Sequence, residues 1–451
     1  MRLNVFQQVM RLWDRVHPYN AAQVLHVRGR ADVDRIGRAW ARTLEVLGLG
    51  RVRVSGDAFA HDACDPRTAA DAVRVVDGGV TLAEHVSGEM NRPFDEGVED
   101  DQPVCPFRPF VLRQADSHDL GLVYHHWVAD SASIRLLLRE WFYRIHEPAR
   151  ARSVPVESPR GGYWHHFGPS RGRWSLGEGF LSALRMTTRL CNARRVERPL
   201  ADYRVRCEVH PLPDGMIGQI REAARQLGAT VNDVFLAAMA EACHRYGATP
   251  PGRSRQELAL GTVVDLRPSC GDDLDDVFGL FLGFTTVVVR PDVLRDWPAL
   301  VRAIAGQNAW QKQVKVAEAS QLRMAAAVAE SRLMSLETWV RFYLRHLPLA
   351  GGISNVNLCR SWAAEYHPQV ILDYLRFSPT GPALPILFTP SSLGERSHVA
   401  LTYRPALIGD ERAARIVATF IQRLRSLAES TSASRMAVCD SAPDLIGSAR
   451  D

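Results

Sequence analysis

The positions of apolar and polar residues predict a chain of interleaved strands and helices. Apolar residues recur at helical spacing in segments that predict helices over 5–16, 32–47, 133–146, 180–192, 214–227, 231–246, 299–330 and 412–427. Alternating or short apolar runs predict strands over 23–27, 119–124, 203–210, 287–289 and 371–377. An irregular stretch rich in Pro, Gly and Arg, 148–213, separates two such groups. The polar end of the chain, 430–451, is expected to fray.

One strand-to-helix transition concentrates groups that can do chemistry. The strand over 119–124 is followed by the turn His125-His126-Trp-Val-Ala-Asp130, and then by the helix over 133–146. A histidine can exchange a proton near neutral pH, and a nearby carboxylate can fix its geometry. Loops held between rigid elements often carry catalytic groups. This turn is therefore the first candidate for an active site.

The same turn also has a purely structural explanation. Asp130 stands just ahead of a helix, where an acidic side chain caps free N–H groups. The chain has 15 histidines, so a neighbouring pair is expected by chance, and His165-His166 is a second pair without a matching Asp. We interpret that second pair as structural. The local pattern alone leaves catalysis and helix capping open as explanations of the first.

A resemblance that extends along the chain favours catalysis. The spacing His125-His126-x-x-x-Asp130 resembles the HHxxxD motif of the condensation-domain acyltransferase superfamily. That superfamily includes nonribosomal peptide condensation domains, polyketide-associated acyltransferases, wax ester synthases and chloramphenicol acetyltransferase. Further segments that resemble it follow in the same order, at 230–240, 264–268, 278–289, 351–357 and 401–427. One departure is Ser131, where the superfamily usually has glycine, a residue that permits a tight turn.

The resemblance implies an α/β architecture with the two-lobed fold of chloramphenicol acetyltransferase. Each lobe is expected to hold a mixed β-sheet flanked by helices, with an active-site tunnel between the lobes. The N-terminal lobe, 1–175, carries the HHxxxD motif. The C-terminal lobe, 176–451, carries the Asp265-Leu-Arg-Pro268 and Ser354-Asn355 segments and returns one crossover to the first lobe.

The resemblance also assigns roles around the motif. It implies that His126 is the general base in the tunnel. Consecutive side chains at a strand end point to opposite sides, so His125 is expected to support the turn instead. Asp130 is expected to form a buried pair with an arginine of the second lobe, and Arg267 is the best candidate. The alternative for Arg267 is a solvated surface arginine.

Four further residues are predicted to bind substrate, each with a structural alternative, which for Ser131 is capping of the following helix. Trp127 follows the histidine pair, and a position in the core explains it equally well. Ser131 adds a hydroxyl group beside the motif. Ser354 and Asn355 are expected to hydrogen-bond the pantetheine arm or the oxyanion, and a plain strand-end role explains them as well.

The composition excludes several classes of protein. The content of 46% hydrophobic and 23% charged residues is typical of a soluble globular protein, and no apolar stretch is long enough to span a membrane. The eight cysteines include no CxxC pair, so neither a metal site nor a disulfide framework is expected, and a cytoplasmic location follows. The basic residues are 53 arginines and two lysines, spread along the chain rather than gathered into a nucleic-acid-binding stripe.

The sequence therefore predicts a stand-alone acyltransferase of natural-product biosynthesis. The resemblance implies transfer of an acyl group from a phosphopantetheine thioester to an amine or hydroxyl. The expected donor is an acyl or peptidyl carrier protein or CoA, and the expected acceptor is a small molecule. No tightly bound cofactor is expected, and the protein is expected to be a monomer. Two alternatives remain. One is a lipid-type O-acyltransferase that uses acyl-CoA, with 339–347 as a candidate membrane-surface helix, although a core helix is favoured there. The other is a non-catalytic relative that docks a carrier protein.

Overall fold

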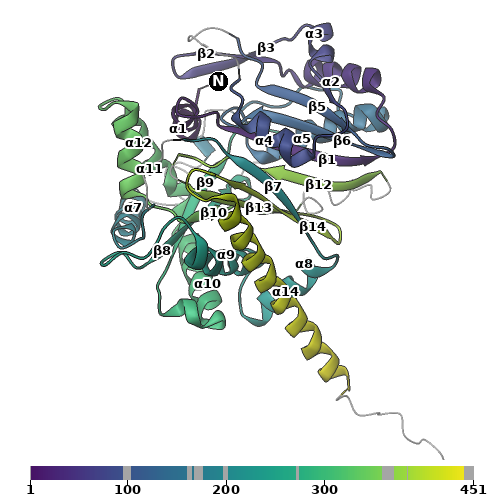
Figure 1. The fold of residues 1–451 in the computed structure, drawn as a ribbon. Coiled ribbons are helices and arrows are strands. Elements are labelled where there is room, and N and C mark those ends of the chain that lie inside the picture. The colour runs from purple at the N-terminus through teal and green to yellow at the C-terminus, as the bar shows by residue number, and fades with distance from the viewer. Residues whose placement is uncertain are drawn as a thin grey trace, which may run out of the picture.

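Two mixed β-sheets with their flanking helices make up the molecule (Figure 1). The computed structural model describes residues 2–94, 103–159, 165–166, 176–196, 202–270, 274–357, 370–382 and 384–440. Both sheets contain parallel and antiparallel pairs, so the predicted α/β architecture with two mixed sheets is confirmed.

The first sheet has five strands in the order β12-β1-β6-β5-β4. Its members are β1 (Asn20–Arg28), β4 (Arg74–Val76), β5 (Phe107–Arg113), β6 (Ser117–His125) and β12 (Ile371–Phe377). A separate hairpin is formed by β2 (Arg51–Ser55) and β3 (Ala58–Asp62). Strand β6 lies at the centre, and eight of its nine residues are buried, which explains its nearly continuous apolar sequence.

The two faces of β6 enter different cores. Leu120, Leu122 and Tyr124 pack in one core with helices α2 (Val33–Leu47) and α5 (Ser131–His146), whereas Val123 packs on the other face with α4 (Leu82–Asn91). This period of two residues continues to the end of the strand. It therefore sends the side chains of the last strand residue, His125, and of its neighbour His126 in opposite directions.

The helices of the first lobe begin where side chains cap them. They are α1 (Val5–Asp14), α2 (Val33–Leu47), α3 (Pro66–Asp71), α4 (Leu82–Asn91) and α5 (Ser131–His146). Each follows a residue whose side-chain oxygen accepts an N–H of the first turn: Asn4, Asp32, Asp65, Thr81 and Asp130. Gly48, with φ of 69°, ends α2 in the left-handed conformation that glycine adopts without strain.

The second sheet has the order β7-β14-β13-β10-β8-β9, with β11 beside β13. Its strands are β7 (Arg206–Leu212), β8 (Leu258–Asp265), β9 (Leu282–Val289), β10 (Gly351–Ile353), β11 (Val356–Asn357), β13 (Ile386–Leu393) and β14 (Arg396–Tyr403). Its helices are α7 (Leu176–Leu190), α8 (Met216–Gln226), α9 (Val231–Tyr246), α10 (Trp297–Gln313), α11 (Val316–Ser331), α12 (Leu336–His346) and α14 (Asp410–Asp440). Helix α9 is almost fully buried, and it packs with α8, α10 and α14 in the main core of this lobe.

A strand from the second half of the chain completes the first sheet. Strand β12 lies antiparallel to β1, and this pairing sets Arg376 opposite Gln23. A smaller core continues across the boundary, where Leu375 and Phe377 of β12 pack with Cys207 of β7 and Ala400 of β14. The two lobes therefore share both a strand and a hydrophobic core.

Two predicted segments differ from the structure. The helical region predicted over 299–330 is two helices, because Lys315 adopts the left-handed conformation with φ of 55° between them. The prediction of fraying from residue 430 is wrong for 430–440, which continue α14, whereas 441–451 lie outside the described residues. The predicted lobe boundary at 175 also lies outside them and stays a prediction.

Trp339 of α12 is buried and donates its Nε1–H to the carbonyl of Ala327 at 2.9 Å, which favours the core-helix interpretation of 339–347.

The strand that leads to the motif tolerates little change in volume. A Cβ atom at Gly121 of β6 would lie 2.0 Å from the ring of Phe110. We expect Gly121→Ala to lower the free energy of unfolding by about 1–3 kcal/mol, as overpacked cores do. Gly88→Ala in α4 is the matched control, because no atom lies within 4 Å of the added methyl group. The control is expected to stabilise by about 0.5–1 kcal/mol, since alanine favours a helix over glycine. Urea unfolding measures both variants, and an unchanged midpoint for Gly121→Ala contradicts this view of the packing.

Candidate active site

The turn between β6 and α5 is fastened by backbone hydrogen bonds from both lobes. The N–H of His125 donates to the carbonyl of Pro106 at 2.9 Å, and that of His126 to the carbonyl of Tyr19 at 3.1 Å. The N–H of Asp130 donates to the carbonyl of Gly279, in the second half of the chain, at 3.0 Å. The motif is therefore held at its start by the first lobe and at its end by the second.

His126 faces a cavity of about 100 Å³ at the junction of the lobes. The ring of Tyr19 stacks on its imidazole, with the centroids 5.6 Å apart and the planes 8° from parallel. Its Nδ1 lies 3.3 Å from the carbonyl oxygen of Ala129, and only a protonated Nδ1 can donate to that acceptor. Nε2 is then the basic nitrogen. Burial lowers the pKa of His126 to about 4, so the imidazole is neutral at physiological pH and able to accept a proton.

His125 points away from that cavity. Its ring stacks on Phe94, with centroids 5.1 Å apart and planes 8° from parallel. Its Nε2 lies 3.4 Å from the carboxylate of Asp14 at the end of α1. Burial lowers the pKa of this imidazole as well. The two histidines thus have different surroundings, and only His126 is among the residues that line the cavity.

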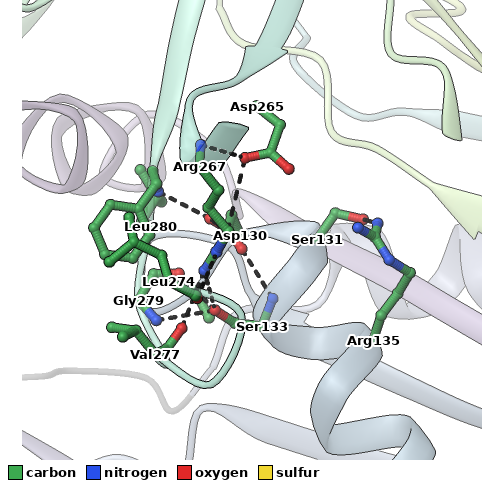
Figure 2. Close-up of polar contacts among 12 residues, drawn as sticks. Asp130, Ser131, Ser133, Arg135, Asp265, Arg267, Leu274, Val277, Gly279 and Leu280 are labelled. Carbon is green, nitrogen blue, oxygen red and sulfur yellow. Dashed lines mark hydrogen bonds and ion pairs between the residues drawn. The ribbon is translucent and has the colours of Figure 1, made fainter. Parts of the chain in front are cut away.

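Asp130 joins the turn to the second lobe through a buried ion pair (Figure 2). One carboxylate oxygen caps α5 by accepting the N–H of Ser133 at 2.9 Å. The other accepts the N–H of Phe281 at 2.9 Å and the Nη1–H of Arg267. The helix cap that the local sequence suggested and the ion pair that the resemblance implied are both present on the same side chain.

Arg267 is fully engaged in this contact. Its Nη2 donates to the Ser133 hydroxyl at 3.0 Å and to the Val277 carbonyl at 3.2 Å, and its Nε donates to the Leu274 carbonyl at 3.3 Å. Although burial alone raises the pKa of Asp130, the guanidinium and the backbone N–H donors hold that pKa below its usual value. Asp130 is 1% exposed and Arg267 8% exposed, which excludes the solvated alternative for the arginine.

Ser131 lies in helical backbone as the first residue of α5, and not in the left-handed region that favours glycine. Its hydroxyl accepts hydrogen bonds from Gln23 at 3.1 Å and from Arg135 at 2.9 Å, a contact that is visible beside the ion pair in Figure 2. Replacement of glycine here therefore adds a polar group to the site without backbone strain.

Ser354 and Asn355 lie in the break between β10 and β11, not within a strand, and both line the cavity. The hydroxyl of Ser354 accepts from Nη2 of Arg376 at 2.9 Å, and its carbonyl accepts from the same nitrogen. Arg135 and Arg376 were not predicted from the sequence. The available signal was weak, because each arginine shares a largely buried element with other charged residues: Arg139, Glu140 and Arg144 in α5, and Asp373 in β12.

Trp127 belongs to the core, and its prediction as a tunnel residue is not supported. The side chain is 5% exposed and meets the ring of Phe59 edge-on, with centroids 6.0 Å apart. The guanidinium of Arg11 lies over its indole at 5.7 Å from the centroid. Trp127 therefore packs beneath the turn, as the core alternative predicted, and it is not among the residues that line the cavity at His126.

A second cavity, of about 170 Å³, adjoins the first. Both are lined by Tyr19, Val263, Phe284, Pro379 and Leu387, so one wall separates them. The second cavity is largely apolar and includes Trp339, Met324 and Leu347 of the second lobe. A polar compartment at His126 thus lies next to an apolar one.

Two features are absent from the described residues. Within the described ranges, no cluster of three or more His, Cys, Asp or Glu side chains is arranged to hold a metal ion. No helix in those ranges combines the length and apolar character needed to cross a membrane.

Removal of either partner of the buried pair should destabilise the fold. We expect Asp130→Ala and Arg267→Ala each to lower the free energy of unfolding by about 3–5 kcal/mol, because a charge is left buried without its partner. Glu337→Ala is the matched control, since Glu337 pairs with Arg341 at the surface, with side chains 74% and 75% exposed. That variant should change stability by less than about 1 kcal/mol. Chemical unfolding of all three decides the point, and a small loss in Asp130→Ala rules out a supporting role for the pair.

No protein-family model matches the chain. Among curated proteins, it is 24% identical over 185 residues to one of the plipastatin synthase subunits of Bacillus subtilis, covering 40% of this chain and 7% of that protein. It is also 24% identical over 305 residues to an uncharacterized protein of Mycobacterium tuberculosis, covering 64% of this chain and 66% of that protein. The chain thus spans less than two thirds of the length of these relatives.

Similarity to solved structures extends over almost the whole chain. The trichothecene 15-O-acetyltransferase of Fusarium sporotrichioides superposes with a TM-score of 0.70 and 11% identity, over 95% of both chains. The first condensation domain of the calcium-dependent antibiotic synthetase, in complex with a substrate analogue, gives a TM-score of 0.67 and 17% identity, over 95% of this chain and 97% of that one. The predicted resemblance to the condensation-domain acyltransferase superfamily is therefore confirmed at the level of the fold: the chain has the two-lobed architecture that condensation domains share with this acetyltransferase.

Proposed function

We propose that this protein is a condensation-type acyltransferase of natural-product biosynthesis. It moves an acyl group from a phosphopantetheine thioester, on a carrier protein or CoA, to an amine or hydroxyl. The observation that carries the proposal is His126, a neutral imidazole with its Nε2 available in a cavity at the junction of the lobes. The fold shared with condensation domains and an O-acetyltransferase supports the same class of reaction.

The reaction needs one base and firm positioning. A thioester carbonyl is already reactive, so the acceptor can attack it directly without a covalent acyl-enzyme. Nε2 of His126 removes the proton from the attacking nitrogen or oxygen as the new bond forms. The C–S bond then breaks, and the protonated imidazole returns the proton to the departing thiolate. Positioning of two substrates beside a fixed base supplies a large share of such rate enhancements.

The surroundings of His126 suit this role. The Nδ1–H···O=C contact with Ala129 keeps the ring in one tautomer, and Tyr19 stacked on the imidazole restricts its rotation. Asp130 makes no hydrogen bond to the imidazole, because both of its oxygens are bound to groups of α5 and the second lobe, although its charge raises the pKa of His126 against the larger effect of burial. The arrangement therefore differs from a Ser-His-Asp relay, in which the carboxylate contacts the histidine directly.

The adjoining apolar cavity supports an apolar acyl group. Its lining includes Val9, Trp13 and Trp339, and about 170 Å³ is enough for an alkyl or aryl segment of the donor. The same cavity also suits a lipid-type O-acyltransferase that takes long-chain acyl-CoA. Donor preference separates the two classes, because a carrier-dependent enzyme discriminates against free CoA thioesters.

Replacement of the base should abolish transfer without unfolding the protein. We expect His126→Ala to reduce kcat by about 10²–10⁴-fold, the usual contribution of a general base. The assay measures thiol release from the same acyl group presented on CoA and on a carrier protein. His210→Ala is a control, since His210 pairs with Glu208 on β7, away from this cavity. A folded His126→Ala variant with unchanged turnover on both donors would falsify the proposed role.

The pH dependence should lack the inflection of an ordinary histidine. Because burial lowers the pKa of His126 to about 4 from 6.5, the free base is present throughout the range above pH 5. With a hydroxyl acceptor, kcat/KM is therefore expected to stay level between about pH 8 and 5 and to fall towards pH 4. Stability changes in the same direction: a buried neutral histidine contributes stability above pH 6.5 that is lost as the pH falls towards 4. The folded fraction is measured alongside, and a clear inflection near pH 6.5 in fully folded enzyme contradicts the assignment.

A further inference from the structure

Two buried arginines face the cavity beside His126. Arg376 of β12 is 4% exposed and Arg135 of α5 is 9% exposed, and both line the cavity with the imidazole. Within the part of the chain that the structure describes, neither side chain forms an ion pair with a carboxylate, in contrast to Arg267 with Asp130. A buried cation without a counterion is uncommon, because burial removes its hydration.

Both guanidinium groups are held in place without being neutralised. Nη2 of Arg376 donates to the hydroxyl and the carbonyl of Ser354, and its Nε has no hydrogen-bond partner. Nη1 of Arg135 donates to the hydroxyl of Ser131, which Gln23 fixes from the other side. A guanidinium carries five N–H donors, so most of them remain for a ligand. Ser131 therefore acts as the support of Arg135.

The two charges also act on each other. Burial lowers the pKa of Arg376, and the nearby charge of Arg135 lowers it further. The other carboxylate that lines the cavity, Asp265, accepts the backbone N–H of Arg267. Burial raises the pKa of Asp265, and the charge of Arg135 opposes that rise without a direct ion pair between the two side chains. Two like charges in one small cavity repel, and an anion bound between them relieves that repulsion.

We propose that Arg376 and Arg135 bind a free carboxylate of the acceptor, which is therefore an amino acid or hydroxy acid that is not attached to a carrier. This proposal rests on the acyl-transfer function proposed above and names the acceptor class of that site. A carboxylate matches a guanidinium in a planar, two-point contact. An acceptor presented as a carrier thioester has no such carboxylate at its reacting end.

The size and position of the cavity favour this ligand over a phosphate. Its volume of about 100 Å³ accommodates a small carboxylate with its neighbouring carbon and nucleophile. The phosphate of a pantetheine arm lies at the far end of the arm from the thioester carbon. It cannot reach Arg376 while the thioester lies at His126. The apolar acyl group is accommodated separately, in the adjoining apolar cavity.

The chemical step is balanced with this acceptor. The carboxylate binds the two arginines, and the adjacent amine or hydroxyl attacks the thioester carbon as His126 accepts its proton. An amide or ester bond forms, the C–S bond breaks, and His126 returns the proton to the thiolate. The products are the N- or O-acylated acid and the free pantetheine thiol, with no oxidant, reductant or metal required.

Direct binding of a small carboxylate tests the site without knowledge of the acceptor. Thermal unfolding is followed with sodium lactate and with its neutral analogue lactamide, at equal ionic strength. Lactate is expected to raise the unfolding midpoint of the wild-type protein and lactamide to leave it unchanged. The shift should disappear in Arg376→Gln and Arg135→Gln, and persist in Arg341→Gln, which removes an exposed arginine of α12. No shift in the wild type, or an equal shift in Arg376→Gln, overturns the proposal.

Turnover identifies which substrate carries the carboxylate. Free amino and hydroxy acids are compared with their amides as acceptors, with decanoyl-pantetheine as donor. Arg376→Gln is expected to lower kcat/KM for the acids by roughly 10²–10³-fold, through the KM of the acceptor and not that of the donor. Arg376→Lys, which keeps the charge but loses the planar contact, should recover part of that loss. Equal use of acids and amides contradicts the proposal. A second arm pairs a succinyl donor, which carries a carboxylate, with a neutral alcohol as acceptor. If Arg376 is needed only for that pair, the arginine recognises the donor and the proposal is wrong.

The two proposals fail in different ways. His126→Ala should bind lactate as the wild type does, although it cannot transfer an acyl group. If the wild type transfers acyl groups but does not bind lactate, the acceptor assignment is wrong and the acyltransferase proposal stands. If lactate binds at Arg376 and neither thioester donor is consumed, the acyltransferase proposal is wrong.

Discussion

The buried contact between Asp130 and Arg267 is the interaction on which the rest of the site depends. It fixes the end of the HHxxxD turn, caps the helix that follows, and ties the first lobe to the second. An ion pair in this position is a costly way to obtain stability, because both charges lose their hydration. The pair contributes more by fixing the position of the turn than by adding to the free energy of folding. Every polar atom of the carboxylate and all three guanidinium nitrogens have assigned partners, so the turn has one conformation.

The division of labour within the motif follows from strand geometry. Since β6 alternates its side chains between two cores, consecutive histidines at its end cannot share one environment. One imidazole is used to pack against Phe94 and α1, and the other remains available in the cavity. The need for an uninterrupted, buried strand immediately before the motif explains why Gly121 lies beneath the ring of Phe110.

Much of this could be predicted from the sequence, and the reasons for the omissions are physical. The amphipathic helix α2 was predicted to within one residue because its periodicity is strong, and the strand over 371–377 was predicted at its observed bounds. The break at Lys315 was missed because a single left-handed residue leaves no trace in hydrophobic periodicity. Trp127 carries no local signal that separates a core ring from a cavity ring. Arg376 was missed because its neighbours in space, Ser354 and Gln23, lie far from it along the chain.

The crossing of β12 into the first sheet has a consequence for recombination between relatives. The two arginines that line the cavity come from α5 in the first half of the chain and from β12 in the second. An exchange of complete lobes at a single junction would separate Arg135 from Arg376 and pair each with a foreign counterpart. A chimaera designed to transfer acceptor selectivity from one relative to another must therefore exchange 371–377 together with α5, which carries Arg135. The segments that carry Arg135 and Arg376 are therefore far apart in the gene, although the two side chains lie in one cavity.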